Sequence, residues 1–238
     1  MPTYNERDNI RTIVDRLLDV VPDATILVFD DNSPDGTGDI ADELAAAHPT
    51  VVAHHGAGKA GLGVAYLTAF RWGLDEGYDV FVEIDADGSH PPESLPDVLA
   101  LLEPPTSASL AIGSRWMRGG KVVNWPKSRE LLSRTANVYT RMMLGMGVRD
   151  ATAGFRAYTR EILERIDFDS VESKGYGFQV DMTFRVSRLK ARIAETPIVF
   201  REREHGESKM SGSIVKEAML LVTAKGLRRL VPRRSADN

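Results

Sequence analysis

The sequence predicts an α/β protein built on a mostly parallel sheet with helices on both faces. Apolar runs typical of strands alternate with segments of helical periodicity through the first 115 residues. Such an alternation produces a parallel sheet covered by helices. Acidic clusters directly follow two of the apolar runs. Because ligands of these sheets bind at the carboxyl ends of strands, the acidic clusters are expected to mark the binding site.

Length and composition agree with this fold class and exclude several functions. The chain has 238 residues, of which 42% are apolar and 27% charged, with a formal charge of −4 and no cysteine. This composition is typical of a globular protein with a sizeable core. The lack of cysteine excludes disulfides, thiolate metal sites and a catalytic cysteine. No apolar run reaches the roughly 18 residues that span a bilayer, and the acidic balance disfavours nucleic acid as a partner.

The first 115 residues are expected to alternate regularly between helices and strands. Residues 6–20 carry apolar side chains at helical spacing, and the β-branched run 25–29 that follows ends in Asp30 and Asp31. By the same criteria, further helices are expected over 38–47, 61–76 and 92–102, and strands over 51–54, 80–84 and 110–113.

The alternation stops after residue 115. The pairs Gly119-Gly120 and Trp125-Pro126 predict a loop, and 151–158 is a polar stretch that contains glycine. Helices are expected over 129–146, 178–190 and 213–230, and a strand over 198–200. Because no linker or repeat separates these parts, we expect one domain over 1–238.

Asp85 and Asp87 follow the apolar run 80–84 and are separated by one residue. Two carboxylates in this arrangement can both bind one Mg²⁺ or Mn²⁺ ion and leave coordination positions for phosphate oxygens. The alternative is an ordinary turn, because Asp, Gly and Ser favour turns and Pro91-Pro92 favours the start of a helix.

The segment that begins at Asp30 permits two interpretations. The oxygen-bearing residues from Asp31 to Asp42 match the spacing of a calcium-binding loop, so a non-catalytic calcium-binding module at 31–42 is one hypothesis. Two features oppose it, because the last position is Asp instead of Glu and the preceding segment is an expected strand. A turn that caps the next helix fits better, and it leaves Asp31 to accept hydrogen bonds from a base or ribose.

Two groups of residues suit phosphate. The glycine-rich segment 56–63 contains Lys59 but lacks the Ser or Thr of a P-loop, so it predicts only a weak anion site before a helix. Arg129 and Ser133 are four residues apart and share one face of a helix, and with Arg115 they suit a phosphate monoester. Surface salt bridges are the alternative role of these arginines.

A basic, glycine-containing loop follows the expected strand at 198–200. It contains Arg203, Ser208 and Lys209. Its alternative interpretation is an ordinary solvated loop.

Several motifs resemble those of one enzyme family. They are PTYNE (2–6), DDNSPDGT (30–37), DADGSHPPE (85–93), NWPKSRELLSR (124–134) and HGESKM (205–210), and they occur in order over nearly the whole chain. The chain thereby resembles the family 2 glycosyltransferases, and within them the dolichol-phosphate or polyprenol-phosphate mannose synthases. PTYNE and the Asp-x-Asp strand are shared by many family 2 enzymes, whereas the combination is much narrower.

The resemblance implies a GT-A glycosyltransferase fold and an enzyme that transfers mannose, with inversion, from GDP-mannose to a polyprenyl or dolichyl monophosphate. Mg²⁺ or Mn²⁺ is the implied cofactor. The implied organisation is a nucleotide and metal half over 1–115, an acceptor half over 116–212, and an amphipathic helix with a basic tail over 213–238. The family's first apolar strand normally precedes PTYNE, so the resemblance implies that this strand is missing before residue 2.

The resemblance also implies roles for individual residues. The donor-binding residues are Pro2, Tyr4, Glu6, Asp31, Lys59 and Asp85. The metal site is Asp85 and Asp87, with Ser89 where related sequences often have Gln. The acceptor-phosphate residues are Arg115, Arg129 and Ser133. The catalytic residues are Asp87, Arg115, Arg203 and Lys209, and Gln179 and Asp181 occupy a motif in which Glu is commoner than Asp.

A lipid acceptor implies contact with a membrane surface. The expected helix at 213–230 has an apolar stripe, and basic residues lie in and after it: Lys225, Arg228, Arg229, Arg233 and Arg234. Such a segment can dock on an anionic bilayer, although a core-packed helix with a frayed tail is equally compatible. We expect a cytoplasmic protein attached peripherally to the cytoplasmic face of a membrane, directly or through a membrane-anchoring partner. Transfer from another donor, such as UDP-glucose, to the same lipid phosphate is the alternative activity.

Overall fold

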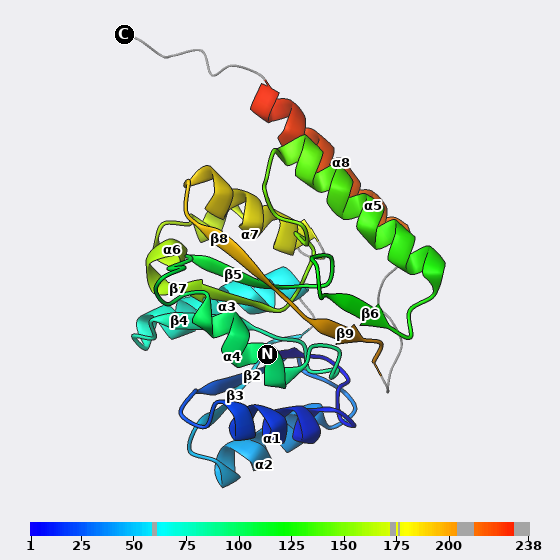
Figure 1. The fold of residues 1–238 in the computed structure, drawn as a ribbon. Helices are drawn as coiled ribbons and strands as arrows, with labels where there is room; N and C mark the ends of the chain where they lie inside the picture. The colour runs from blue at the N-terminus through cyan, green and yellow to red at the C-terminus, as the bar shows by residue number, and fades with distance from the viewer. Residues whose placement is uncertain (59–60, 172–174, 176, 204–211, 231–238) are drawn as a thin grey trace.

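The computed structural model describes residues 1–58, 61–171, 175, 177–203 and 212–230. Its first half contains the strand and helix alternation that the sequence predicts (Figure 1). Strands β1 (Pro2–Thr3), β2 (Ile26–Asp30) and β3 (Val51–His55) form a parallel sheet in the order β1-β2-β3. Helices α1 (Ile10–Val20) and α2 (Thr37–Ala47) pack against it and bury their apolar faces.

A second sheet has the order β4-β7-β5-β8. β5 (Leu110–Ser114) and β8 (Ile193–Pro197) are parallel, whereas β7 (Arg156–Thr159) runs antiparallel to both β5 and β4 (Val80–Glu83). The sequence did not predict β7 or β8. The polar, glycine-containing segment 151–158 instead includes most of β7, and its charged Arg156 side chain is fully buried.

Two short strands form a third sheet. β6 (Lys121–Val123) pairs in parallel with β9 (Val199–Arg201), so the expected loop after Gly119-Gly120 contains a strand. The strand expected at 198–200 is confirmed as β9, one residue later than predicted. Beyond β9, the backbone N–H of Glu202 donates to the carbonyl of Val123 at 3.0 Å.

The remaining helices cover the second sheet or project from it. Their bounds are α3 (Leu62–Asp75), α4 (Leu95–Ala100), α5 (Lys127–Leu144), α6 (Arg160–Glu164), α7 (Gly177–Arg188) and α8 (Gly212–Leu230), with 3₁₀ turns η1 (Pro92–Ser94) and η2 (Phe168–Ser170). The helix expected over 92–102 is therefore a 3₁₀ turn followed by the short α4. A core cluster that includes Phe70, Tyr158 and Phe178 joins α3, α7 and the second sheet.

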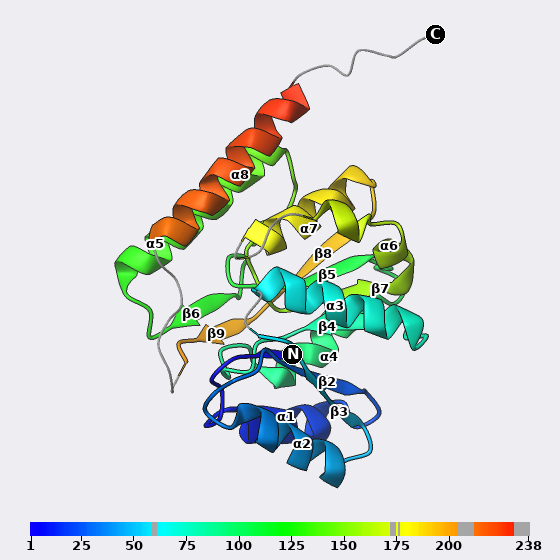
Figure 2. The same cartoon turned by 180° about the vertical axis from the view of Figure 1, so that it is seen from behind.

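Helices α5 and α8 lie side by side and extend away from the sheets (Figures 1 and 2). Tyr139 and Thr223 share a hydrogen bond of 2.7 Å between the two helices. A Cβ added to Gly226 would lie 2.9 Å from Cε of Met143, so this glycine allows the close approach. Across the described part of the chain, every helix is too short or too polar to cross a bilayer.

A cavity of about 630 Å³ lies between the parallel sheet β1-β2-β3 and the mixed sheet β4-β7-β5-β8. Residues of β2 and β4 line its two sides, and mostly apolar residues of α1, α3 and α4 complete the lining. At one end the hydroxyl of Tyr78 donates to Thr25 Oγ1 at 2.8 Å. β1, which lies beside β2 at this gap, consists of two residues.

Candidate active site

The two carboxylates of the Asp-x-Asp motif lie just beyond the carboxyl end of β4, as the sequence predicts. Asp87 is buried, accepts a hydrogen bond from the Ser89 backbone N–H at 3.0 Å and forms a 2.9 Å ion pair with Arg203. Burial alone would raise the pKa of Asp87, but the hydrogen bonds from Ser89 and the charge of Arg203 hold it below its ordinary value. Asp87 is therefore ionised at neutral pH.

Asp85 lies in a different environment from Asp87. Partial burial and the neighbouring charge of Asp87 raise the pKa of Asp85, while Arg203 opposes the shift. The Asp85 side chain keeps 37% of its area exposed, so a cation can reach it. Among the described residues there is no group of three or more His, Asp or Glu side chains placed to hold a metal ion. The two carboxylates alone would thus leave most coordination positions to a ligand and water.

His90, which the sequence analysis did not single out, is a buried residue that contacts the Asp-x-Asp loop. Its Nδ1 accepts a hydrogen bond from the Asp85 backbone N–H at 3.3 Å, and its ring stacks on Phe155 with centroids 5.5 Å apart. Burial lowers the pKa of His90 to about 4, so the ring is neutral and can accept this bond. The only signal in the sequence was its position directly after the acidic motif.

The predicted nucleoside-binding residues lie at the carboxyl ends of β1 and β2. The Asp31 N–H donates to the Thr3 carbonyl at 3.0 Å, and the Glu6 N–H donates to Thr37 Oγ1 at 2.9 Å. Both acidic side chains are mostly buried, whereas Pro2 and Tyr4 are half-buried. Lys59 and Lys209, which were also predicted to bind the donor or act in catalysis, lie outside the described residues.

The segment between Asp30 and Thr37 forms the turn that the sequence analysis preferred over a calcium loop. It joins a strand to α2, and its carboxylates accept hydrogen bonds from within or beside the turn. Asp30 accepts from the hydroxyls of Thr3 at 2.9 Å and Ser33 at 2.6 Å, and Asp35 accepts from Thr37. These bonds fix the loop at the strand end.

The predicted acceptor-phosphate residues come together on the other side of the Asp-x-Asp motif. Arg115 follows β5, while Arg129 and Ser133 lie on α5. All three line one cavity of about 170 Å³, which Asp85 and Asp87 also line. The structure thus brings the predicted metal ligands and the predicted phosphate ligands to the same cavity, although they are far apart in the sequence.

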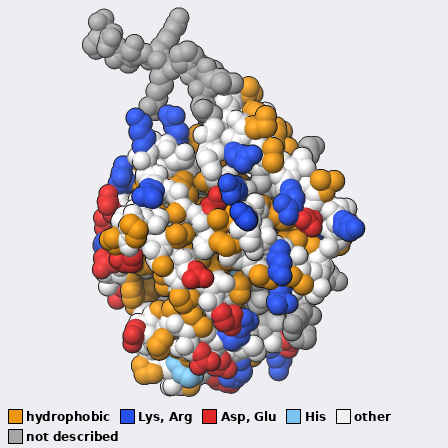
Figure 3. Space-filling view, viewed as in Figure 1, with side chains coloured by type: hydrophobic (Ala, Val, Ile, Leu, Met, Phe, Trp, Pro, Cys, Tyr) orange, Lys and Arg blue, Asp and Glu red, His pale blue; other side chains and the backbone are white. Residues whose placement is uncertain are grey.

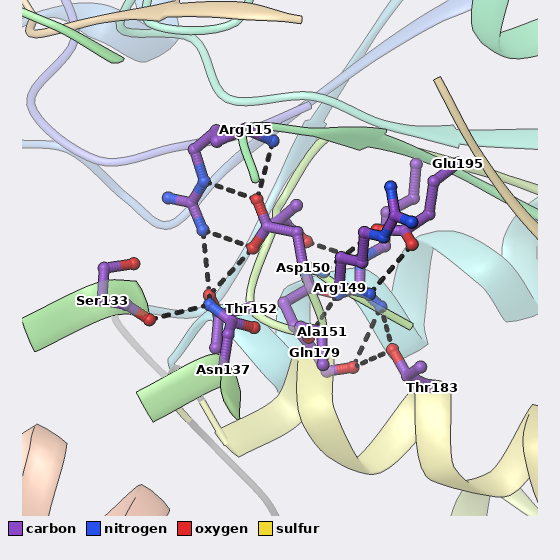
Figure 4. A network of polar contacts seen from close by, with 12 residues as sticks. Arg115, Ser133, Asn137, Arg149, Asp150, Ala151, Thr152, Gln179, Thr183 and Glu195 are labelled. Atoms are coloured by element: carbon purple, nitrogen blue, oxygen red, sulfur yellow. Dashed lines mark hydrogen bonds and ion pairs between the residues drawn. The ribbon is translucent and has the colours of Figure 1, made fainter. Parts of the chain in front are cut away.

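Arg115 is held by a buried carboxylate that the sequence analysis missed (Figure 4). Its guanidinium donates to the two oxygens of Asp150 at 2.7 and 2.8 Å, and its backbone N–H donates to the same carboxylate at 2.9 Å. Burial alone would raise the pKa of Asp150, but Arg115 holds it below its ordinary value. Glu195 on β8 in turn accepts from the backbone N–H groups of Arg149 and Asp150.

Arg129 is paired with a second carboxylate, that of Glu202. Its Nη1 donates to both oxygens of Glu202 at 2.8 and 2.6 Å. The guanidinium carbon lies 4.1 Å from the centroid of the Trp125 ring, an arrangement typical of a cation–π contact. Arg115 lies 5.3 to 5.6 Å from the rings of Trp116, Trp125 and Phe200. Aromatic faces therefore separate and orient the two cations.

Gln179 and Asp181, both on α7, have different surroundings. Gln179 lines the cavity, and its Nε2 donates to Glu83 at 2.6 Å. Burial raises the pKa of Glu83 to about 7. Asp181 forms ion pairs with Lys225 at 2.7 Å and Arg185 at 3.2 Å, which ties α7 to α8. In this position Asp181 supports the helix packing.

Comparison with known proteins identifies close relatives. Residues 1–167 match the family model described as glycosyl transferase family 2. The chain is 57% identical over 227 residues to the undecaprenyl-phosphate mannosyltransferase of Micrococcus luteus, covering 95% of this chain and 92% of that protein. It is 55% identical over 229 residues to the polyprenol monophosphomannose synthase of Mycolicibacterium smegmatis, covering 96% and 86% respectively.

A solved structure is similar at the level of the fold. Glucosyl-3-phosphoglycerate synthase from Mycobacterium tuberculosis, in complex with Mn²⁺, UDP-glucose and phosphoglyceric acid, superimposes with a TM-score of 0.68. The similarity covers 98% of this chain and 79% of that one at 20% sequence identity.

Proposed function

The chain belongs to glycosyl transferase family 2, and from that premise we propose that it transfers mannose from GDP-mannose to a polyprenyl monophosphate. It is a glycosyltransferase with a GT-A fold, as the resemblance implies. The observation that carries the proposal is the cavity that Asp85, Asp87, Arg115, Arg129 and Ser133 line together. The names of the two relatives support the lipid phosphate as acceptor and mannose as the sugar.

A divalent metal fits the donor side of this cavity. Carboxylate oxygens suit Mg²⁺ and Mn²⁺, and Asp87 is ionised because Ser89 and Arg203 stabilise its charge. Asp85 and Asp87 would hold the ion, with Ser89 beside them. When bound, the metal would neutralise the diphosphate of the donor. The relatives in fold are crystallised with Mn²⁺ or Mg²⁺, which supports a divalent ion without selecting one.

The proposed reaction is a displacement with inversion at the anomeric carbon of mannose. An oxygen of the acceptor phosphate forms a bond to this carbon, the bond to the diphosphate oxygen breaks, and the electron pair leaves with GDP. A phosphate monoester has its second pKa near about 6, so the nucleophile is already anionic and needs no strong base. Arg115, Arg129 and Ser133 hold this anion, and Arg203 lies where it can stabilise the charge that develops on the leaving diphosphate. Lys209 would join Arg203 in that role.

The acceptor side faces the projecting helices, which suits a lipid. Large apolar side chains are exposed on α5 and α8, namely Leu131, Val138, Met142, Leu220 and Leu227. Figure 3 shows hydrophobic and basic side chains gathered over these helices at the upper right. We propose that this face lies against the cytoplasmic surface of a membrane, where the polyprenyl chain resides. A membrane-anchoring partner is compatible with the same face.

A transfer assay tests the function. Purified protein is incubated with labelled GDP-mannose or UDP-glucose and a polyprenyl phosphate, with Mg²⁺, Mn²⁺ or a chelator. We expect labelled lipid only with GDP-mannose and a divalent ion, and product from UDP-glucose alone would replace the proposed donor.

Asp87→Ala is expected to lower transfer by at least about a thousandfold, because it removes the ionised carboxylate of the proposed metal site. The measurement is kcat/KM at saturating Mg²⁺ or Mn²⁺. Asp23→Ala, at an exposed carboxylate that does not line the cavity of the Asp-x-Asp motif, is the matched control and should retain wild-type turnover. Near-normal turnover of Asp87→Ala would contradict the assignment of the metal site.

A further inference from the structure

The two arginines of the acceptor site have carboxylate partners that differ in accessibility. The side chains of Arg115 and Asp150 are 9% and 0% exposed, whereas those of Arg129 and Glu202 are 20% and 25% exposed. Asp150 is additionally fixed by backbone hydrogen bonds, since it accepts from the Arg115 N–H and its own N–H donates to Glu195. The Glu202 carboxylate accepts its hydrogen bonds from Arg129, so this pair can separate while Arg115 and Asp150 stay together.

Glu202 accepts hydrogen bonds from one of the two terminal nitrogens through which a ligand can bind Arg129. One face of the guanidinium is covered by the Trp125 ring at 4.1 Å. The Nε atom of Arg129 is buried and has no hydrogen-bond partner among the described residues. A ligand in the cavity therefore reaches this arginine through its terminal nitrogens, and Nη1 already donates to both oxygens of Glu202.

A carboxylate and a phosphate cannot both occupy this position at little cost. They accept hydrogen bonds from the same donors, and two anions a few ångströms apart repel each other strongly in a partly buried site. A phosphate that binds Nη1 of Arg129 must therefore displace the Glu202 carboxylate. The reverse also holds, because the carboxylate on its return competes with any phosphate that remains.

The surroundings of Glu202 leave room for its side chain to rotate away from Arg129. Glu202 lines a polar cavity of about 650 Å³ that adjoins the acceptor cavity, and its lining includes Arg16 and Arg201 as well as the carboxylates of Asp8, Asp87 and Glu93. Its backbone stays anchored, because its N–H donates to Val123 and the Arg201 N–H donates to the Ser89 carbonyl at 3.1 Å. Rotation of the side chain alone can move the carboxylate away from Arg129 without moving the Asp-x-Asp loop.

We infer that Glu202 is a built-in competitor of the acceptor phosphate at Arg129. The inference rests on the proposed function, which makes Arg129 a phosphate ligand. The product keeps one anionic phosphate oxygen, so Glu202 competes with substrate and product alike. Glu202 weakens the binding of substrate and of product by the same factor, and thereby prevents a site with two arginines from retaining its product.

Binding of two small probes to Glu202→Gln tests the inference. Farnesyl phosphate represents the monoester substrate, and methyl farnesyl phosphate represents the diester product. The substitution removes the charge but keeps the size, so calorimetry should show each probe bound about threefold to tenfold more tightly than by the wild type. The two factors should be equal, because the competitor occupies the same donors in both cases. Weaker or unchanged binding of the probes would overturn the inference.

Three further variants make the result specific. Glu130→Gln removes a carboxylate from α5 that pairs with Arg134 at 2.8 Å, and it should leave both affinities unchanged. Glu202→Ala should tighten binding in the same direction as Glu202→Gln, and tightening by Gln alone would contradict simple competition. Arg129→Ala should weaken both probes, and wild-type affinity in that variant would refute the proposed acceptor site itself. A normal Arg129→Ala result with an unchanged Glu202→Gln would refute only the competition.

Discussion

Individual side chains around the cavity explain how two cations are kept close together. Arg115 and Arg129 line the same cavity, and each is balanced by its own carboxylate and by an aromatic ring. Asp150 is fully buried, so it must be paired to remain charged. Because Arg115 donates to both Asp150 oxygens, this carboxylate sets the plane of the guanidinium. We therefore regard Asp150 as a positioning residue for Arg115.

Asp150→Asn is expected to raise the KM for the polyprenyl phosphate by about tenfold and leave the KM for GDP-mannose unchanged. The reason is that the amide supplies one acceptor where the carboxylate supplies two, so Arg115 loses its fixed orientation. Steady-state kinetics with each substrate varied in turn measure this. Asp169→Asn, which breaks an exposed pair with Arg71, is the matched control and should change neither KM.

The same variant has an expected pH signature in stability. Because Arg115 holds the pKa of Asp150 below its ordinary value, the pair stabilises the fold above that value and loses this contribution as pH falls through the lowered pKa. The difference in unfolding free energy between wild type and Asp150→Asn should therefore shrink below about pH 4. A difference that stays constant from pH 7 to pH 3 would mean that the ion pair does not stabilise the protein.

At the scale of elements, the pair α5 and α8 has one face on the body and one face in solvent. Asn137, Thr140 and Leu144 of α5 are buried, whereas Leu131, Val138 and Met142 are exposed on the opposite face. The spacing of the exposed residues follows one stripe of a helix. An apolar stripe beside exposed Lys127, Arg134 and Arg141 supports the proposed contact with an anionic bilayer.

The double variant Met142→Gln with Leu227→Gln is expected to weaken binding to anionic lipid vesicles by about tenfold, because it removes apolar area that would enter the bilayer. These side chains are 73% and 55% exposed, so the fold should be retained. Co-sedimentation with vesicles measures the binding.

Val64→Gln, at an exposed apolar residue of α3, is the matched control for vesicle binding. Transfer to a short, water-soluble acceptor should be normal in all three proteins. Unchanged co-sedimentation of the double variant would assign membrane contact to another surface.

At the scale of the whole molecule, the site lies where two sheets converge. β4 brings the Asp-x-Asp motif and α5 brings the proposed acceptor residues to one cavity, and the proposed donor residues lie at the ends of β1 and β2. An apolar cavity lies between β2 and β4, which belong to different sheets and do not pair with each other.

The sequence was sufficient where the information is local. Helical periodicity located α5 and α7 to within about two residues, whereas α1 begins at Ile10, four residues later than expected. It failed for β7, because the buried Arg156 donates to the carbonyls of Ala151, Ala153 and Gln179, and such long-range partners leave no local pattern. β6 and β8 were missed because they are half-exposed and lack an apolar run.

What the sequence determined by itself is the fold class, the family, and the residues that end strands or repeat along a helix. Strand ends and helix faces follow from spacing along the chain, which is why Asp85, Asp87, Arg129 and Ser133 could be named in advance. Only the tertiary structure decided which carboxylate pairs with which arginine. Asp150 lies 35 residues from Arg115, and Glu202 lies 73 residues from Arg129. Such pairs form because buried charges require a partner, and folding alone brings that partner within reach.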